Sequence, residues 1–256
     1  MNTDLTALKP ALVWKHFAAM TQIPRPSFHE EKIRRYVLDV ARSLGLECRE
    51  DAAHNVYVRK PASKGMENRA GVILQAHLDM VPQKNNDKKF DFLKDPIRAY
   101  VDGDWVTADG TTLGADNGIG AAAILAVLED DTLEHGPLEA LFTATEETGM
   151  AGAFGLKKGL LKGDIHSGIQ IVCQRANANK LLFRLLRRWP AAHDLLLCSV
   201  DGGGLRNAIP REATATVLVR SKEFEAFRKE VRAFEKLMRA EFAGVEEGIS
   251  IKAEAC

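Results

Sequence analysis

Two adjacent carboxylates follow directly after an apolar run: Glu146 and Glu147 in the stretch "FTATEETGMAGAFGL". Neighbouring like charges repel each other and cost free energy to desolvate, so such a pair at the edge of a core needs a cation or a solvated turn. One carboxylate could bind a cation while the other takes a proton from water as a general base. A solvated pair at the end of a strand is the alternative.

A histidine and an aspartate stand two residues apart in "ILQAHLDM", as His77 and Asp79. In an extended segment this spacing places both side chains on one face. A histidine there can bind a metal through one ring nitrogen while the neighbouring carboxylate orients the ring. A histidine satisfied by hydrogen bonds beside a turn aspartate is the alternative.

A third acidic group lies in "DGTTLGADNGIGAAAILAVLED", where Gly114 and Gly118 flank Ala115, Asp116 and Asn117. The glycines allow a tight turn that delivers Asp116 to the start of the following helix. Asp116 is therefore a candidate metal ligand. Capping of that helix by Asp116 or Asn117 is the alternative.

The elements that must position these side chains alternate along the first part of the chain. Strands are predicted at "LECRED", "NVYVRK", "GVILQAH" and "GPLEALFTATEE", and helices at "PALVWKHFAAMTQ", "SFHEEKIRRYVLDVARSLG" and "NGIGAAAILAVLED". Ser27 and Glu30 form a predicted capping box for the second helix. This alternation indicates an α/β sheet with helices on its faces. Ligands collect outside the carboxyl ends of strands in such sheets, so we expect the candidate residues to meet there.

The remainder of the chain follows a different order. From Ile165 the pattern reads strand "HSGIQIV", helix, strand, strand, helix and final strand "GISIKAEA". This βαββαβ order is typical of a ferredoxin-like unit. We therefore predict two domains, residues 1–164 and 165–256. In the longer helix of the second domain, apolar residues at three- and four-residue spacing predict a buried stripe, namely Phe224, Phe227, Val231, Phe234 and Leu237.

Composition excludes several functional classes. The 256 residues are 46% hydrophobic, and 35 basic residues balance 35 acidic ones, so no global field favours binding of nucleic acid or of an anionic membrane. The four cysteines form no C-x-x-C pair, which favours a reducing compartment and argues against a disulfide framework or zinc on thiolates. The longest apolar stretch, Gly118 to Leu128, is too short to span a bilayer. We expect a cytoplasmic protein.

Several longer motifs together carry a resemblance to a known family. "HLDMVPQKN", "DGTTLGADNGIG", "ATEETGMAGAFGL", "HSGIQI", "RANANKLL" and "RNAIPRE" resemble the aminoacyl-histidine dipeptidase branch (Xaa-His dipeptidase, bacterial carnosinase-like) of the M20 metallopeptidases, over nearly the whole chain. The resemblance implies a zinc-peptidase-like mixed sheet with helices on its faces, plus a ferredoxin-like lid that forms a homodimer. It also implies hydrolysis of dipeptides, with Xaa-His or broader preference.

The resemblance also implies roles for individual residues. A complete site would hold two Zn²⁺ ions, with Co²⁺ or Mn²⁺ as alternatives: His77 would bind one ion, Asp116 would bridge both, and Glu147 would bind the other. Asp79 would orient His77, and Glu146 would be the general base.

The lid would supply substrate contacts. His166 of "HSG" resembles the residue that stabilises the developing oxyanion, Asn207 of "RNAIPRE" resembles a substrate-binding residue, and Arg220 is a weaker candidate for the substrate carboxylate. Hydrogen bonding within the lid itself is the alternative for each of the three.

The sequence departs from the family pattern at two places. His166 follows Ile165 directly where the family has a strand with a further acidic ligand, and the chain ends at Cys256 before the family's last metal-binding histidine. The chain therefore resembles an internally deleted and C-terminally truncated relative with an incomplete catalytic domain. A catalytically impaired fragment that only dimerises or binds metal weakly is the alternative function. Aminoacylases and tripeptidases share the same metal chemistry, so the substrate class rests on the resemblance.

Overall fold

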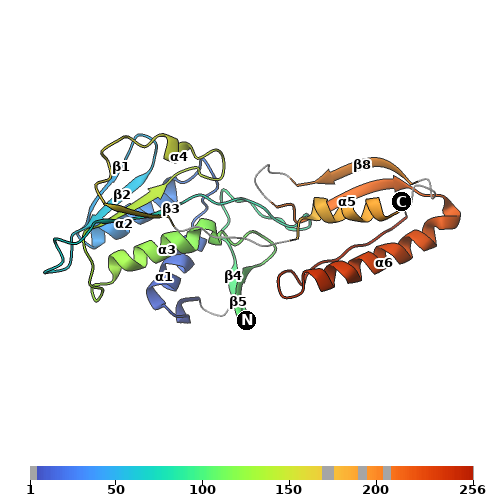
Figure 1. Cartoon of the computed structure of the whole chain (residues 1–256), viewed down its shortest axis with the longest axis horizontal. Helices are drawn as coiled ribbons and strands as arrows, with labels where there is room; N and C mark the ends of the chain where they lie inside the picture. Colours follow the sequence, from blue (N-terminus) through green and yellow to red (C-terminus); the bar gives the residue numbers. More distant parts are fainter. Residues whose placement is uncertain (1–4, 169–175, 190–194, 204–208, 256) are drawn as a thin grey trace. The chain divides into compact units, whose positions relative to one another are not determined.

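The protein divides into two compact units in the computed structural model, Met1–Ile171 and Val172–Cys256. The structure describes residues 5–168, 176–189, 195–203 and 209–255 (Figure 1). The sequence predicted the boundary after Asp164, whereas the division falls after Ile171. The strand between these two positions accounts for the difference, because it pairs within the first unit.

A five-stranded mixed sheet organises the first unit. Its strands are β1 (Glu47–Glu50), β2 (Val56–Lys60), β3 (Val72–His77), β6 (Leu138–Thr143) and β7 (Ile165–Gly168), in the order β1-β2-β6-β3-β7. The pairs β1–β2 and β2–β6 are antiparallel, while β3 pairs in parallel with both β6 and β7. The predicted α/β class with a mixed sheet is confirmed.

Helices cover this sheet. They are η1 (Leu5–Ala7), α1 (Ala11–Thr21), α2 (Glu31–Ser43), α3 (Ala115–Glu129) and the short α4 (Ala151–Phe154). Helix α3 packs on β3 and against α1, and α2 packs on β1 and β2 (Figure 1). Helix α3 is apolar on nearly all sides because it lies between α1 and the sheet, as its buried Ile124 and Leu125 show. No helix in the described part of the chain is long and apolar enough to cross a membrane.

The central strands β3 and β6 decide where the chain leaves the sheet. Every residue of β6 is buried, which fits its near-continuous apolar sequence. The parallel register pairs Val72 with Leu138 and ends with His77 opposite Thr143. Segments that follow the two strands therefore leave at the same edge of the sheet.

A hairpin that the sequence patterns did not predict is inserted before α3. It joins β4 (Ala99–Asp102) to β5 (Trp105–Ala108) through the two-residue loop Gly103–Asp104. Gly103 has a φ of 58°, a conformation that glycine adopts without steric cost. The D-G dipeptide in "VDGDW" was the available turn signal.

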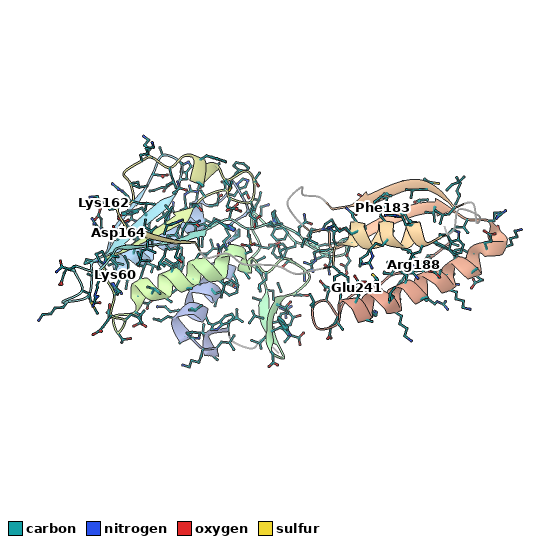
Figure 2. The ribbon with its side chains drawn as sticks, in the orientation of Figure 1. Lys60, Lys162, Asp164, Phe183, Arg188 and Glu241 are labelled. Atoms are coloured by element: carbon teal, nitrogen blue, oxygen red, sulfur yellow. The ribbon has the colours of Figure 1, made fainter. Side chains whose placement is uncertain are left out.

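The second unit contains two helices and a two-stranded antiparallel sheet. Its elements are α5 (Ala178–Arg188), β8 (Leu196–Gly202), β9 (Ala213–Leu218), η3 (Ser221–Glu223) and α6 (Phe224–Glu241). Arg184 of α5 donates two hydrogen bonds of 2.8 Å to Glu241 of α6, a residue labelled in Figure 2. The core of this unit gathers Leu181, Leu185, Phe227, Val231, Phe234, Met238 and Ile249.

The buried stripe of α6 differs from the prediction at both ends. Phe227, Val231 and Phe234 are buried as predicted. Leu237 is 44% exposed, and Met238 is buried in its place. Phe224, at the first residue of the helix, is only partly buried. Near the C-terminal end of the helix, the buried face is therefore shifted by one residue from the predicted stripe.

Among the residues that the structure describes, only the middle of the predicted βαββαβ order is present. In the described residues the second unit reads αββα. Of the expected first strand, "HSGIQIV", the first three residues form β7 with Ile165 in the sheet of the first unit, and residues 169–172 lie outside the described residues. The expected last strand forms no ladder in the described residues, although Ile249 and Ile251 pack against the core of the second unit.

Candidate metal centre

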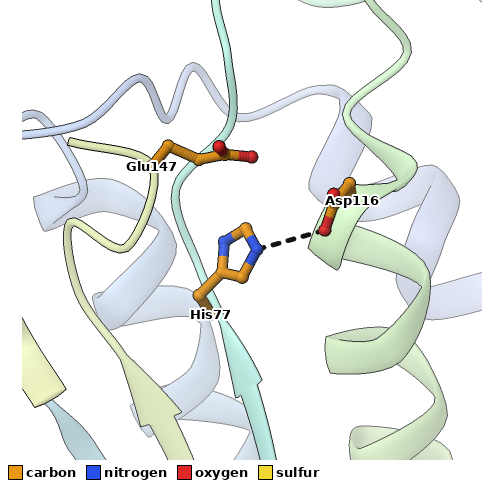
Figure 3. Close-up of side chains that lie close together, drawn as sticks. All are labelled: His77, Asp116 and Glu147. Atoms are coloured by element: carbon orange, nitrogen blue, oxygen red, sulfur yellow. Dashed lines mark hydrogen bonds and ion pairs between the residues drawn. The ribbon is translucent and has the colours of Figure 1, made fainter. Parts of the chain in front are cut away.

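His77 is the last residue of β3, at the edge where β3 and β6 end together. Its side chain is 7% exposed. Its Nε2 atom lies 3.1 Å from Asp116 Oδ1 and 3.8 Å from Glu146 Oε2. The strand therefore delivers one imidazole nitrogen into a group of carboxylates, as Figure 3 shows for Asp116 and Glu147.

Asp116 approaches His77 from the first turn of α3. Gly114 precedes the helix with a φ of 73°, a left-handed conformation that favours glycine. Asp116 itself has non-helical angles, φ −86° and ψ 110°, so the first turn is distorted. The start of the helix has no side-chain cap. The Asp116 carboxylate faces His77, with its Oδ1 atom 3.1 Å from the imidazole Nε2.

Glu146 and Glu147 lie in the turn after β6. The potential ligand atoms of His77, Asp116 and Glu147 all lie within 4.8 Å of one another (Figure 3). Within the described ranges, this is the one group of three or more His, Cys, Asp or Glu side chains arranged in this way. The structure thus brings together the predicted ligands.

Asp79 holds the turn and the histidine together. It is fully buried and accepts hydrogen bonds from the backbone N–H groups of Glu146 at 2.9 Å and Glu147 at 3.0 Å. Its Oδ1 atom lies 3.3 Å from His77 Nδ1, which leaves Nε2 for the carboxylate cluster. Asp79 therefore orients the imidazole and fixes the two glutamates at once.

Two further residues support this arrangement, and the sequence patterns assigned both another role. The Ser27 hydroxyl donates to Asp79 Oδ2 at 2.7 Å, and Glu30 Oε1 accepts hydrogen bonds from the backbone N–H and hydroxyl of Thr145. Helix α2 begins at Glu31, and its N-cap residue makes no side-chain cap. The predicted Ser27–Glu30 capping box is wrong, because both side chains instead bind the loops that carry the cluster.

Crowding of the carboxylates shifts the proton affinities in the cluster. Burial, with the nearby charges of Asp116, Glu146 and Asp79, outweighs the effect of His77 and raises the pKa of Glu147 to about 7. Burial alone would lower the pKa of His77, but hydrogen bonds to Asp116 and Asp79 raise it to about 10. Burial would raise the pKa of Asp79, but hydrogen bonds from His77, Ser27 and Glu146 hold it below its usual value.

A divalent cation fits this set of donors. One imidazole nitrogen and two carboxylates are ligands that Zn²⁺ commonly takes in proteins. Burial, together with the charges of neighbouring carboxylates, raises the pKa of Glu147, and a bound cation would stabilise its charged form in place of a proton. The residues present therefore fit one metal ion.

Of the predicted lid residues, His166 lies in the first unit with the cluster, and Arg220 lies in the second unit. His166 is exposed on β7, opposite Ile73 near the start of β3, whereas His77 ends that strand, about 13 Å further along at the usual rise per residue. Arg220 donates a hydrogen bond to Glu223 at 2.9 Å within the second unit. Asn207 lies outside the described residues.

Comparison with known proteins identifies relatives of the whole chain. Residues 154–246 match the family model of the M20 peptidase dimerisation domain. The chain is 42% identical to the cytosol non-specific dipeptidase of Escherichia coli, in a match that covers 97% of this chain and 62% of that protein. The alignment runs over 299 residues, more than the 256 of this chain, so parts of the relative lie opposite gaps in it. This result agrees with the predicted internal deletion.

Solved structures give the same relationship. The aminoacylhistidine dipeptidase of Vibrio alginolyticus matches 99% of this chain at 38% identity and a TM-score of 0.65, and the match covers 63% of that protein. A tripeptidase of Staphylococcus aureus shares the fold at 19% identity and a TM-score of 0.54. The chain thus spans about three fifths of the length of its nearer relatives. By sequence and by fold, the protein is similar to these two dipeptidases, and its match to the M20 peptidase dimerisation domain agrees with that similarity.

Proposed function

We propose that this chain derives from a metal-dependent dipeptidase and retains the part of the active site that binds a metal ion and activates water. The observation that carries the proposal is the convergence of His77, Asp116 and Glu147 beside Glu146. Relatives named for dipeptide and aminoacylhistidine hydrolysis support dipeptides as the substrate class. The preference would be for Xaa-His or for a broader range of dipeptides.

The residues of the cluster would each have a separate role in binding the metal ion. His77 through Nε2, Asp116 and Glu147 would hold Zn²⁺, with Co²⁺ or Mn²⁺ as alternatives, and Asp79 would keep His77 in the orientation that directs Nε2 at the ion. When bound, the ion would polarise the peptide carbonyl and increase the acidity of the attacking water. The ligand set is that of a single ion; a second ion would need ligands beyond this cluster.

Glu146 is the proposed general base. Its carboxylate stands next to the cluster, 37% exposed, with its backbone fixed by Asp79 and its Oε2 atom 3.8 Å from His77 Nε2. From this position it could take a proton from the attacking water and later give it to the leaving amine. Glu146 and Glu147 would thus have different tasks, although they are adjacent in the sequence.

A second candidate function is metal binding without turnover. The gaps in the alignment with the dipeptidase and the three-membered ligand set favour it. In either case we propose that the protein forms a homodimer through its second unit, because residues 154–246 match a dimerisation domain.

Glutamine substitutions of the two glutamates test the proposed roles. The experiment compares the 256-residue chain with a version completed by the segments of its Escherichia coli relative that fall opposite gaps. In the completed, zinc-loaded protein, Glu146→Gln should leave the zinc content nearly intact and reduce dipeptide turnover by several orders of magnitude, because an amide cannot accept the proton. Glu147→Gln should lower the zinc content, and activity should fall with it.

Measurements on the 256-residue chain itself distinguish the two candidate functions. Zinc binding with negligible hydrolysis would favour metal binding without turnover, whereas hydrolysis at about 1–10³ per second would favour an active enzyme. Equal zinc content and equal turnover in the wild type and both glutamine variants of the completed protein would contradict the proposed roles.

A further inference from the structure

A buried arginine spans the two loops that carry His77 and Asp116. Arg25 is 1% exposed. Its Nη1 atom donates to the backbone carbonyls of Leu78 at 2.8 Å and Asp79 at 3.3 Å, and its Nη2 atom donates to the carbonyl of Gly114 at 2.5 Å. One guanidinium therefore connects the chain directly after His77 to the chain just before Asp116.

The glycines around Asp116 leave space for this side chain. A Cβ atom placed on Gly114 would lie 2.6 Å from Arg25 Nη2, and one placed on Gly118 would lie 2.5 Å from the same atom. Gly114 is also required by its positive φ. Gly118 has no such requirement, so the close approach of Arg25, together with Phe17, accounts for its lack of a side chain.

Burial of Arg25 costs free energy, which its hydrogen bonds to the two loops must offset. Removing a guanidinium from water is unfavourable, and burial lowers the pKa of Arg25 to about 10 despite the charges of Asp79 and Asp116. Backbone carbonyls, rather than a paired carboxylate, accept its hydrogen bonds. Two planar donors in a fixed fork set the separation of the loops in a way that a single flexible ammonium cannot.

We propose that Arg25 is a positioning residue that sets the separation between His77 and Asp116 and thereby the affinity of the site for a metal ion. The inference rests on the proposed metal site. It concerns a residue outside the ligand set, in the stretch "IPRPS" that joins α1 to α2.

Lys60 provides a matched control. It is also buried and basic, and its ammonium also donates to two backbone carbonyls, those of Val127 at 3.1 Å and Asp130 at 2.8 Å. These contacts lie at the C-terminal end of α3, and Lys60 pairs with Leu138 at the opposite end of β6 from the cluster (Figure 2 labels Lys60). Loss of Lys60 should therefore affect stability without affecting the metal site.

The experiment titrates Zn²⁺ alone into the full chain by calorimetry, at a temperature where circular dichroism shows every variant folded. Arg25→Met should weaken zinc binding by about 10–100-fold, the usual effect of losing a residue that orients ligands. Arg25→Lys should also bind more weakly than the wild type, because the charge remains but the fork is lost. Lys60→Met should bind zinc with wild-type affinity.

Gly118→Ala tests the inference without touching the arginine. Alanine within a helix normally increases stability relative to glycine, but here its methyl group would displace the guanidinium. We expect weaker zinc binding in this variant, and no further weakening when it is combined with Arg25→Met. It also keeps the test decisive if Arg25→Met does not fold.

The outcomes distinguish this inference from the proposed function. If the wild type binds no zinc, the proposed metal site fails. If the wild type binds zinc and Gly118→Ala and Arg25→Lys bind it equally tightly, the site stands and the role of Arg25 is overturned. Equal weakening by Lys60→Met would also overturn that role, because it would show that any loss of a buried cation has this effect.

Discussion

At the scale of single residues, the cluster shifts the pKa values of two neighbouring carboxyl groups in opposite directions. Glu147 has its pKa raised to about 7 by burial and neighbouring carboxylates, whereas the buried Asp79 is held below its usual pKa by the groups that donate to it. The two acidic residues are in direct contact, because the backbone N–H of Glu147 donates a hydrogen bond to Asp79. The two pKa values differ because several groups donate hydrogen bonds to the Asp79 carboxylate. Glu147 is therefore the carboxylate that a cation would stabilise most.

This shift predicts how pH changes the stability of the metal-free protein. Because the folded state raises the pKa of Glu147 from 4.5 to about 7, the folded state holds its proton more tightly than the unfolded state does. The resulting stabilisation is fully present below pH 4.5 and is lost as the pH rises to about 7. In thermal unfolding with a metal chelator, Glu147 should therefore lower the melting temperature over this range, whereas His16, whose pKa is lowered by burial, contributes in the opposite direction up to pH 6.5.

A substitution isolates the contribution of this group. Glu147→Gln should reduce the fall in melting temperature, most clearly below pH 6.5, because His77 loses its own stabilising contribution only between pH 6.5 and about 10. Glu67→Gln, which changes an exposed carboxylate, should leave the fall in place. An unchanged pH dependence in Glu147→Gln would contradict the raised pKa.

At the scale of elements, the site depends on how β3, β6 and α3 meet. Continuous apolar sequence made the two strands and the helix predictable, and the parallel pairing of β3 with β6 explains why the chain after His77 and the chain after Thr143 leave the sheet together. The predicted convergence of His77, Asp116 and Glu147 followed from this rule and is realised in the structure.

Other features could not be predicted from local patterns. Ser27 and Glu30 have the spacing of a capping box, but their partners Asp79 and Thr145 are more than fifty residues away in the sequence. The four exposed residues of β7 give no local signal that they pair with β3 rather than with a strand of the second unit. Arg25 was overlooked because a lone arginine in a loop has no spacing that indicates burial.

Helix α6 allows a direct test of its observed face. Phe234 is 1% exposed, so Phe234→Ala should reduce the free energy of unfolding of the second unit by about 3–5 kcal/mol. Leu237, which the spacing predicted to be buried, is 44% exposed, so Leu237→Ala should cost well under half as much. Chemical denaturation measures both. Equal losses in the two variants would indicate that Leu237 is buried, as its spacing predicted, and would contradict the observed face.

At the scale of the whole molecule, the chain spans about three fifths of the length of its nearer relatives and leaves apolar surface exposed. Leu196 of β8 and Leu218 of β9 face each other in the ladder and are 62% and 60% exposed. Such a pair on one face of a sheet is unfavourable in water unless another surface covers it. The match of this unit to a dimerisation domain favours a second copy of the chain as the cover.

Light scattering tests this expectation. The 28.2 kDa chain should have about twice its monomer mass, and Leu196→Lys with Leu218→Lys should shift it towards the monomer. Leu133→Lys, at a leucine of the first unit that is 43% exposed, should leave the mass unchanged. A monomeric wild type, or a dimer unaffected by the paired lysines, would contradict dimerisation through this face.

The central claim is that His77, Asp116 and Glu147 form a metal site in this chain. Calorimetric titration of the purified, metal-free protein with Zn²⁺ tests it most directly. The account predicts saturable binding in the wild type and weaker binding in His77→Ala and Asp116→Ala, because each loses one of three ligands whose atoms lie within 4.8 Å of one another. Equal heats in the wild type and both variants, or no binding in the wild type, would contradict it.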